Sequence, residues 1–267
     1  MPVARAVMYL ATVAAIALAV KSLVTGPPGL GWTLLALGGY VALTTVGVVF
    51  ARLEMFADVL SRGPAGARGV ALTFDDGPDP TTTPQVLDAL DAAGAKATFF
   101  VIGEKAERHP DLVRDLLARG HAVGIHGYEH DRLFALRLPW RVRRDLERAV
   151  SVLQGITDER PQLYRAPVGH ISPAMARVIA DLDLRVVGWT IKSLDGWPGS
   201  TAERVARRVV PELRDGSIVL LHDASERSDF VPASLEALPT ILEVAERRQL
   251  DLVRVDSWLL DEPPGSQ

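Results

Sequence analysis

The first 53 residues contain two long runs without a charged side chain, and these runs limit the folds open to the chain. Residues 6–20 form the first run, and residues 30–51 form the second, which is 22 residues long. A helix needs about 20 apolar residues to cross a bilayer, so the second run meets this length. The first meets it if the Lys21 side chain reaches the interface. Because Gly26-Pro27-Pro28-Gly29 between them is typical of a turn, we expect a hairpin of two transmembrane helices.

Two other interpretations of the first run stay open. A short apolar stretch after Arg5 also fits a cleaved signal peptide, and the pair of runs could form a buried hairpin of a soluble protein. The hairpin attaches the chain to the cell membrane through residues 6–51, and after cleavage of a signal peptide the run at 30–51 would still attach it. Positive charge at Arg5, Arg52, Arg62 and Arg68 favours a cytoplasmic location for the rest of the chain, because loops rich in Lys and Arg stay on that side.

The composition of the remaining chain excludes several classes of protein. The first 53 residues hold three basic residues and no acid, so the rest carries a net charge of −7 and no basic surface that predicts a nucleic-acid partner. Nothing in the sequence predicts a protein partner. The absence of cysteine excludes disulfides, a thiol nucleophile and thiolate metal sites. Any metal must therefore be bound by His, Asp or Glu.

From residue 69 onward, short β-rich runs alternate with stretches of helical period, which predicts an α/β fold with a parallel sheet. Seven strands are expected, at 69–73, 96–102, 121–125, 162–165, 185–190, 217–221 and 251–255. Helices are expected at 84–93, 110–119, 139–155, 171–181, 201–214 and 232–248. This pattern fits a barrel or a doubly wound sheet. It divides the chain into a hairpin (1–53), a linker (54–68), one soluble domain (69–258) and a C-terminal tail (259–267).

Titratable residues follow five of the expected strands, at the points where the strands end. They are Asp75 and Asp76, His126 and His130, Arg165, Asp195, and His222. Each has an ordinary structural explanation when taken alone, such as turn chemistry for Asp-Asp-Gly-Pro or a structural ion pair for the arginine. Because the carboxyl ends of parallel strands face one edge, where ligands bind in such folds, the five groups together indicate a site.

The order and spacing of four motifs resemble those of the polysaccharide deacetylases, the NodB-homology domains of carbohydrate esterase family 4. The motifs are Thr73-Phe74-Asp75-Asp76-Gly77-Pro78, the pair His126 and His130, Arg165-Ala166-Pro167-Val168-Gly169, and Leu220-Leu221-His222-Asp223. The resemblance covers residues 69–258. It implies a distorted (β/α)7-type barrel, here preceded by two transmembrane helices.

The resemblance also implies a divalent metal ion held by Asp76, His126 and His130. Zinc is the expected metal, with cobalt, nickel and iron as alternatives. Asp75 would act as general base toward a metal-bound water, with Arg165 as its ion-pair partner. His222 would act as general acid, oriented by Asp195.

Three further residues are expected at the substrate. A backbone N–H near Val168 would help to bind the oxyanion, and Trp197 and Leu220 would enclose the acetyl methyl group. The sequence departs from the family pattern in several places. Gly127 stands where a hydroxyl residue is usual, Val168 replaces an aromatic residue, and Lys192 and Gly196 alter the motif around Asp195 and Trp197.

The expected function is metal-dependent hydrolysis of N-acetyl (or O-acetyl) groups on an amino-sugar glycan, such as peptidoglycan or a chitin-like polymer. One alternative is a deacetylase or deformylase of a membrane lipid-linked sugar. The other is a catalytically silent, membrane-anchored carbohydrate-binding protein. Polymer substrates favour a domain outside the cell, which opposes the charge pattern, so the sequence leaves the side of the membrane open.

Overall fold

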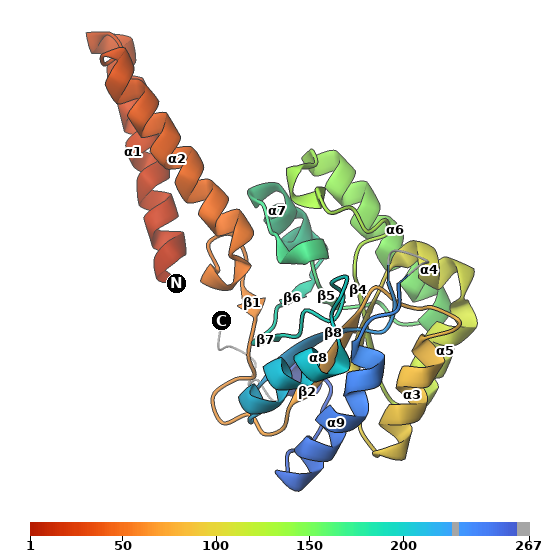
Figure 1. The fold of residues 1–267 in the computed structure, drawn as a ribbon. Coiled ribbons are helices and arrows are strands. Elements are labelled where there is room, and N and C mark those ends of the chain that lie inside the picture. Colours follow the sequence, from red (N-terminus) through yellow and green to blue (C-terminus); the bar gives the residue numbers. More distant parts are fainter. Residues whose placement is uncertain (226–229, 261–267) are drawn as a thin grey trace.

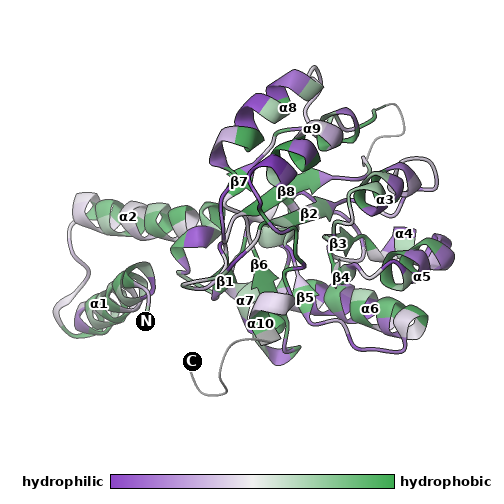
Figure 2. Cartoon of the chain, turned by 90° about the horizontal axis from the view of Figure 1, so that it is seen from below, coloured by the Kyte–Doolittle hydropathy of each residue, from purple (hydrophilic) through white to green (hydrophobic). Residues whose placement is uncertain are grey.

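The structure is a computed structural model that describes residues 1–225 and 230–260 (Figure 1). Residues 261–267 of the expected tail lie outside the described residues. The chain begins with two antiparallel helices, α1 (Val3–Thr25) and α2 (Leu30–Val49), which project from the rest of the molecule. Both helices are long and apolar enough to cross a membrane, with mean hydropathies of 2.0 and 1.7. Only 6% of each apolar window is buried, which is not the burial of a core helix. Figure 2 shows mostly apolar residues along the visible side of α2.

Several contacts fix the base of this hairpin to the domain. The Arg5 side chain near the start of α1 lies 2.7 Å from the Asp58 carboxylate and donates to the Glu54 carbonyl at 3.0 Å. The Ile171 N–H donates to the Val48 carbonyl near the end of α2 at 3.1 Å. The hairpin is therefore attached at a defined orientation and not by a loose linker.

Eight parallel strands form the sheet, in the order β1-β6-β5-β4-β3-β2-β8-β7. Their bounds are β1 (Val59–Leu60), β2 (Ala71–Asp75), β3 (Thr98–Val101), β4 (Ala122–Ile125), β5 (Leu163–Tyr164), β6 (Arg185–Val187), β7 (Ile191–Lys192) and β8 (Ile218–His222). The sheet curls into an incomplete barrel, which confirms the predicted fold class. Thr190, just before β7, connects the two ends of the sheet. Its N–H donates to the Ile218 carbonyl of β8, and its hydroxyl donates to the Ser61 carbonyl beside β1.

The strands differ from the sequence prediction in three places. The expected strand at 251–255 is absent, and only Leu252 forms an isolated bridge with Val70. Two strands were not expected, β1 inside the predicted linker and β7 before Asp195. Each is two residues long, too short to show a period of two in the sequence.

Helices cover the outside of the curled sheet (Figure 1). They are α3 (Thr83–Ala92), α4 (Gly103–Arg108), α5 (Pro110–Ala118), α6 (Pro139–Thr157), α7 (Pro173–Asp181), α8 (Ala202–Val209) and α9 (Ser234–Arg247). The short helix α10 (Ser257–Leu260) instead packs through Trp258 with Ala71 and Phe100 on the other face of the sheet. The predicted helix over 201–214 ends at Val209 and continues as a 3-10 turn, and the six-residue α4 was not expected. Gly94 and Gly120 follow α3 and α5 with positive φ, as expected for residues that end helices.

The central strands are buried on both faces, as in parallel sheets covered by helices. Every residue of β2 and β3 is buried, and Phe74 and Phe99 stack with their ring centroids 5.1 Å apart. Because all eight strands run the same way, the polar residues that follow them meet at one end of the barrel.

Candidate active site

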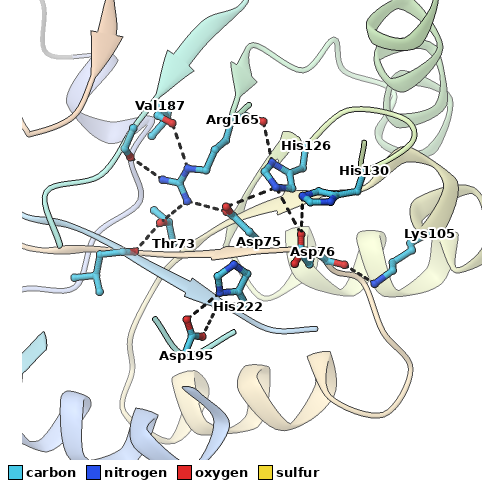
Figure 3. A network of polar contacts seen from close by, with 12 residues as sticks. Thr73, Asp75, Asp76, Lys105, His126, His130, Arg165, Val187, Asp195 and His222 are labelled. Atoms are coloured by element: carbon cyan, nitrogen blue, oxygen red, sulfur yellow. Dashed lines mark hydrogen bonds and ion pairs between the residues drawn. The ribbon is translucent and has the colours of Figure 1, made fainter. Parts of the chain in front are cut away.

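The carboxyl ends of β2, β4, β5 and β8 meet at a cleft of about 420 Å³. Asp75 and His222 are the last residues of adjacent strands and are paired in register. His126 directly follows β4, and Arg165 directly follows β5. Figure 3 shows these side chains, together with Asp76 and His130, turned toward one another.

Asp76, His126 and His130, the three residues expected to hold a metal, lie together, with one potential ligand atom from each within 4.8 Å of the others. The turn after β2 gives Asp76 a φ of 75°, which directs its carboxylate back toward the histidines. Asp76 Oδ1 lies 3.6 Å from His126 Nε2 and 3.4 Å from His130 Nε2. The Arg165 carbonyl contacts His126 Nδ1 at 2.8 Å, so His126 Nε2 is the nitrogen that faces the cluster.

The chemistry of this cluster fits a divalent cation. Asp76 Oδ1 is buried, and no hydrogen-bond donor reaches it within residues 1–225 and 230–260. Burial raises the pKa of Asp76, an effect that the nearby His222 and His126 oppose. Burial, with a further contribution from His126, lowers the pKa of His130 and keeps its imidazole neutral, as metal ligation requires. One carboxylate and two imidazoles are a donor set that zinc and related metals accept.

Asp75 is held by a buried arginine. Arg165 Nη1 donates to Asp75 Oδ1 at 2.8 Å and to Thr73 Oγ1 at 2.7 Å. The same guanidinium donates to two backbone carbonyls, Val187 at 3.2 Å and Gly188 at 2.8 Å. Burial lowers the pKa of Arg165, and the charge and hydrogen bond of Asp75 oppose this. With these donors directed at fixed acceptors, Arg165 allows the Asp75 carboxylate one orientation.

His222 pairs with Asp195, although the sequence around Asp195 fits the family pattern poorly. Asp195 Oδ1 lies 2.9 Å from His222 Nδ1, and Asp195 Oδ2 accepts the His222 backbone N–H at 2.8 Å. Burial acts to lower the pKa of His222, but the charge and hydrogen bond of Asp195 outweigh it and raise the pKa to about 10. Burial acts to raise the pKa of Asp195, and His222 and the Ser193 hydroxyl bring it below its ordinary value.

The loop that carries the two histidines is fixed by a residue that the sequence analysis missed. Asp145 on α6 accepts the Tyr128 N–H at 2.9 Å and the Glu129 N–H at 3.2 Å. This carboxylate holds the loop in place, although the loop has Gly127 at the position where a hydroxyl side chain is usual. Asp145 is a buried acid on the apolar side of an amphipathic helix, which is the one signal that could have identified it.

Lys105 on α4 was also missed, and no pattern in the sequence indicates it. Its ammonium donates to the Asp76 carbonyl at 2.7 Å and to the Ser225 carbonyl at 3.0 Å. Lys105 therefore links the turn after β2 to the segment after the neighbouring strand β8.

The three expected substrate residues all line the cleft. Leu220 is buried, whereas Val168 is 41% exposed and Trp197 is 66% exposed, so these two lie at its open rim. Trp189 and Lys192, which had no assigned role, line the cleft as well. An exposed aromatic ring beside a polar cleft is a surface suited to stacking against a sugar.

Comparison with known proteins agrees with this geometry. The family model for polysaccharide deacetylases matches residues 62–187. A peptidoglycan-N-acetylglucosamine deacetylase of Bacillus cereus is 32% identical over 193 residues, covering 72% of this chain and 68% of that protein. A chitooligosaccharide deacetylase of Sinorhizobium fredii is 38% identical over 167 residues, covering 61% of this chain and 75% of that protein.

A solved structure adds information about the metal. A family 4 acetyl xylan esterase from Clostridium thermocellum in complex with a cobalt ion superposes with a TM-score of 0.65 at 32% identity. The match covers 72% of this chain and 90% of that one. With the strand order, the cleft residues and these relatives in agreement, the chain belongs to the polysaccharide deacetylase family.

Proposed function

We propose that this protein is a metal-dependent deacetylase that hydrolyses N-acetyl groups on an amino-sugar glycan, such as peptidoglycan or a chitin-like polymer. The observation that carries the proposal is the presence in one cleft of three units. These are the Asp76–His126–His130 cluster, the Asp75–Arg165 pair and the His222–Asp195 pair. Together they provide a cation site, a proton acceptor and a proton donor, which are the parts that amide hydrolysis requires.

Asp76, His126 and His130 would hold the cation. A divalent metal bound there supplies a Lewis acid that favours deprotonation of water and polarises the acetyl carbonyl. Zinc fits this donor set, and the cobalt ion of the related esterase supports a metal of this kind.

Asp75 is the residue placed to accept the proton of the attacking water. Its Oδ1 is bound to Arg165, which leaves Oδ2, located 3.8 Å from His126 Nε2, facing the ligand cluster. As the water oxygen bonds to the acetyl carbon, its proton passes to Asp75 Oδ2. The Arg165 guanidinium neutralises the carboxylate and prevents it from turning away.

His222 is the residue placed to protonate the leaving nitrogen. Its Nδ1 is bound to Asp195, so its Nε2 faces the cleft. When the bond between the acetyl carbon and the sugar nitrogen breaks, His222 donates a proton to that nitrogen. The products are acetate and a free amino sugar. Asp195 keeps the imidazole protonated until this step, through the charge that raises the pKa of His222.

We further propose that the α1–α2 hairpin anchors the enzyme in the cell membrane. Its exposed apolar surface, its length and its polar attachment at the base by Arg5 support this placement. The anchor would keep the cleft close to the bilayer, since the chain continues from α2 into β1 within ten residues.

A panel of substrates tests the proposal. The full chain, purified in detergent, is incubated with N-acetylated chitooligosaccharides, peptidoglycan fragments and acetylated xylan, and released acetate is measured. We expect acetate from at least one amino-sugar substrate. Metal binding without acetate release from any of them would instead support a carbohydrate-binding protein without turnover.

A further inference from the structure

A second cavity, of about 450 Å³, lies between the base of the hairpin and the active-site cleft; we call it the hairpin cavity. Its walls come from the end of α2, from β1, from the turn after β5 and from the segment joining β6 to β7. Five residues line both the hairpin cavity and the cleft: Ala166, Val168, Gly169, Trp189 and Lys192. The two spaces therefore share one wall.

The shared wall is closely packed around Trp189. A Cβ atom on Gly169 would lie 2.3 Å from the Trp189 ring, so the indole packs directly on the Gly169 backbone, which has a φ of +77°. Lys192 belongs to the same wall, and its ammonium lies 5.6 Å from the centre of the Trp189 ring. A ligand in the hairpin cavity would thus lie next to a substrate in the cleft.

The charge of the hairpin cavity is positive. Its lining contains Arg52, Arg165, His170 and Lys192 and no Asp or Glu. Arg165 is already committed to Asp75, but neither Arg52 nor Lys192 has a carboxylate partner in the part of the chain that the structure describes. Burial, with the nearby charge of Lys192, lowers the pKa of His170, which is then a neutral hydrogen-bonding group. Two unneutralised cations beside it favour an anionic ligand.

The position of the hairpin cavity indicates how that ligand is carried. Val49 and Phe50, at the end of the second apolar helix, line the cavity, and Phe50 is 48% exposed. If α2 spans the membrane, this point is where the helix leaves the hydrocarbon layer. A cavity that has Phe50 at the end of α2 and the cations Arg52 and Lys192 in the same lining matches a phosphate at the end of a hydrocarbon chain.

We propose that the hairpin cavity binds the phosphate of a lipid-linked sugar, so that the substrate is an N-acetylated sugar carried on a membrane lipid phosphate. Arg52 and Lys192 contact the phosphate, the hydrocarbon chain leaves along Phe50, and the sugar enters the cleft past Trp189. This inference rests on the proposed deacetylase function and specifies its substrate class. Val168 and Lys192, two positions at which the sequence departs from the family pattern, both lie on this path.

A binding measurement tests the cavity without using the catalytic reaction. Farnesyl phosphate, farnesol and inorganic phosphate are titrated into the full chain in detergent micelles. We expect farnesyl phosphate to bind about tenfold more tightly than either other probe, because it alone satisfies the cations and the apolar opening. Equal binding of inorganic phosphate would reveal a simple anion site, and equal binding of farnesol a purely apolar one. Either result would overturn the proposal.

Paired variants separate the cavity from general attraction to the micelle. Arg52→Gln should weaken farnesyl phosphate binding about tenfold, since one charged hydrogen bond is lost. Arg177→Gln is the matched control, because Arg177 is an exposed arginine on α7 that does not line the cavity. It should change the affinity less than twofold, on the order of an exposed surface charge. Equal effects of the two substitutions would contradict the assignment.

Kinetics then connect the cavity to the substrate. We compare acetate release from a soluble chitooligosaccharide and from a farnesyl-phosphate-linked N-acetylglucosamine. Arg52→Gln should lower the ratio of kcat/KM for the lipid-linked over the soluble substrate by about tenfold, whereas Arg177→Gln should not change it. An unchanged ratio in Arg52→Gln overturns the inference. Wild-type enzyme that releases no acetate from either substrate would contradict the proposed function itself, while the binding measurement would still test the cavity.

Discussion

Arg165 connects more of the active site than any other single side chain described above. It is fully buried, and its guanidinium bonds to Asp75, to Thr73 and to two carbonyls after β6. Its Cζ atom lies 4.2 Å from the centre of the Phe100 ring, which covers one flat face of the guanidinium. Its backbone carbonyl also fixes the orientation of His126. The proposed proton acceptor and one proposed metal ligand are thus oriented by one residue.

Removing this side chain should destabilise the protein. Arg165→Met leaves the Asp75 carboxylate buried without its cation, which costs about 3–5 kcal/mol. The free energy of unfolding, measured by denaturant titration, should fall by this amount. In the double variant Asp75→Asn/Arg165→Met, the loss should be smaller than the sum of the single losses, because the charge is removed with its partner. Strictly additive losses would show that the two side chains do not stabilise each other.

The two neighbouring aspartates should have different roles. Asp75→Asn should retain the metal and lower kcat by about 10²–10⁴, the contribution of a general base. Asp76→Asn should lose the metal, because one of three ligands is gone. Metal content by elemental analysis and acetate release measured on the same samples distinguish the two. If Asp75→Asn loses the metal and Asp76→Asn keeps it, the roles are reversed.

The Asp195–His222 pair predicts a change in pH dependence. The protonated form of His222 is the proton donor, so activity falls as pH rises through its pKa. The Asp195 carboxylate raises that pKa, and in Asp195→Asn burial acts without this opposing charge. The alkaline limb of kcat/KM should therefore move to lower pH by about one pH unit or more. A limb that stays in place would mean that another group sets it.

The sequence predicted the residues of the site that lie in the family motifs but not their supports. Asp75, Asp76 and the two histidines could be found because each lies within a few residues of a strand end. Asp145 and Lys105 lie in helices whose other residues face solvent or core in the ordinary way. They reach the site only through the tertiary fold, which no local pattern encodes.

At the scale of elements, length decided most of what could be predicted, although β5, with two residues, was also expected. Strands β2, β3, β4 and β8 have four or five residues, and their buried apolar runs identified them. Strands β1 and β7 have two residues each, and the sheet, not local propensity, keeps them extended. The apolar run at 251–255 shows the converse, because its backbone bonds to the sheet only at Val70, just before β2, and at the Thr98 hydroxyl of β3.

The pairing of β1 with β6 predicts where the folded domain begins. Val59 and Leu60 pair with Val186 and Val187 of β6, and Val59 is buried. A variant beginning at residue 54 keeps this pairing, whereas a variant beginning at residue 64 exposes the edge of β6. The longer variant should have the higher Tm, by about 4–8 °C if β1 contributes about 2 kcal/mol. Equal Tm values would place the domain boundary after β1.

At the scale of the whole molecule, the hairpin and the barrel act as one unit. Arg5 bonds the hairpin base to Glu54 and Asp58 before β1, and Ile171 bonds it to the segment after β5, which also contributes Val168 to the cleft. If the hairpin spans a membrane as proposed, the direction in which the cleft faces the bilayer is set by the fold. The sequence predicted the presence of the hairpin but could not predict this contact, because Val48 and Ile171 are far apart in the chain.

Metal-dependent acetate release is the measurement that most directly tests the proposed catalytic metal site. The full chain is assayed with an N-acetylated glycan as purified, after chelation, and after zinc is returned, beside the His126→Ala variant. We predict that chelation abolishes acetate release, that zinc restores it, and that His126→Ala releases none under any condition. Acetate release that persists after complete chelation, or that is unchanged in His126→Ala, would contradict the assignment of Asp76, His126 and His130 as the catalytic metal site.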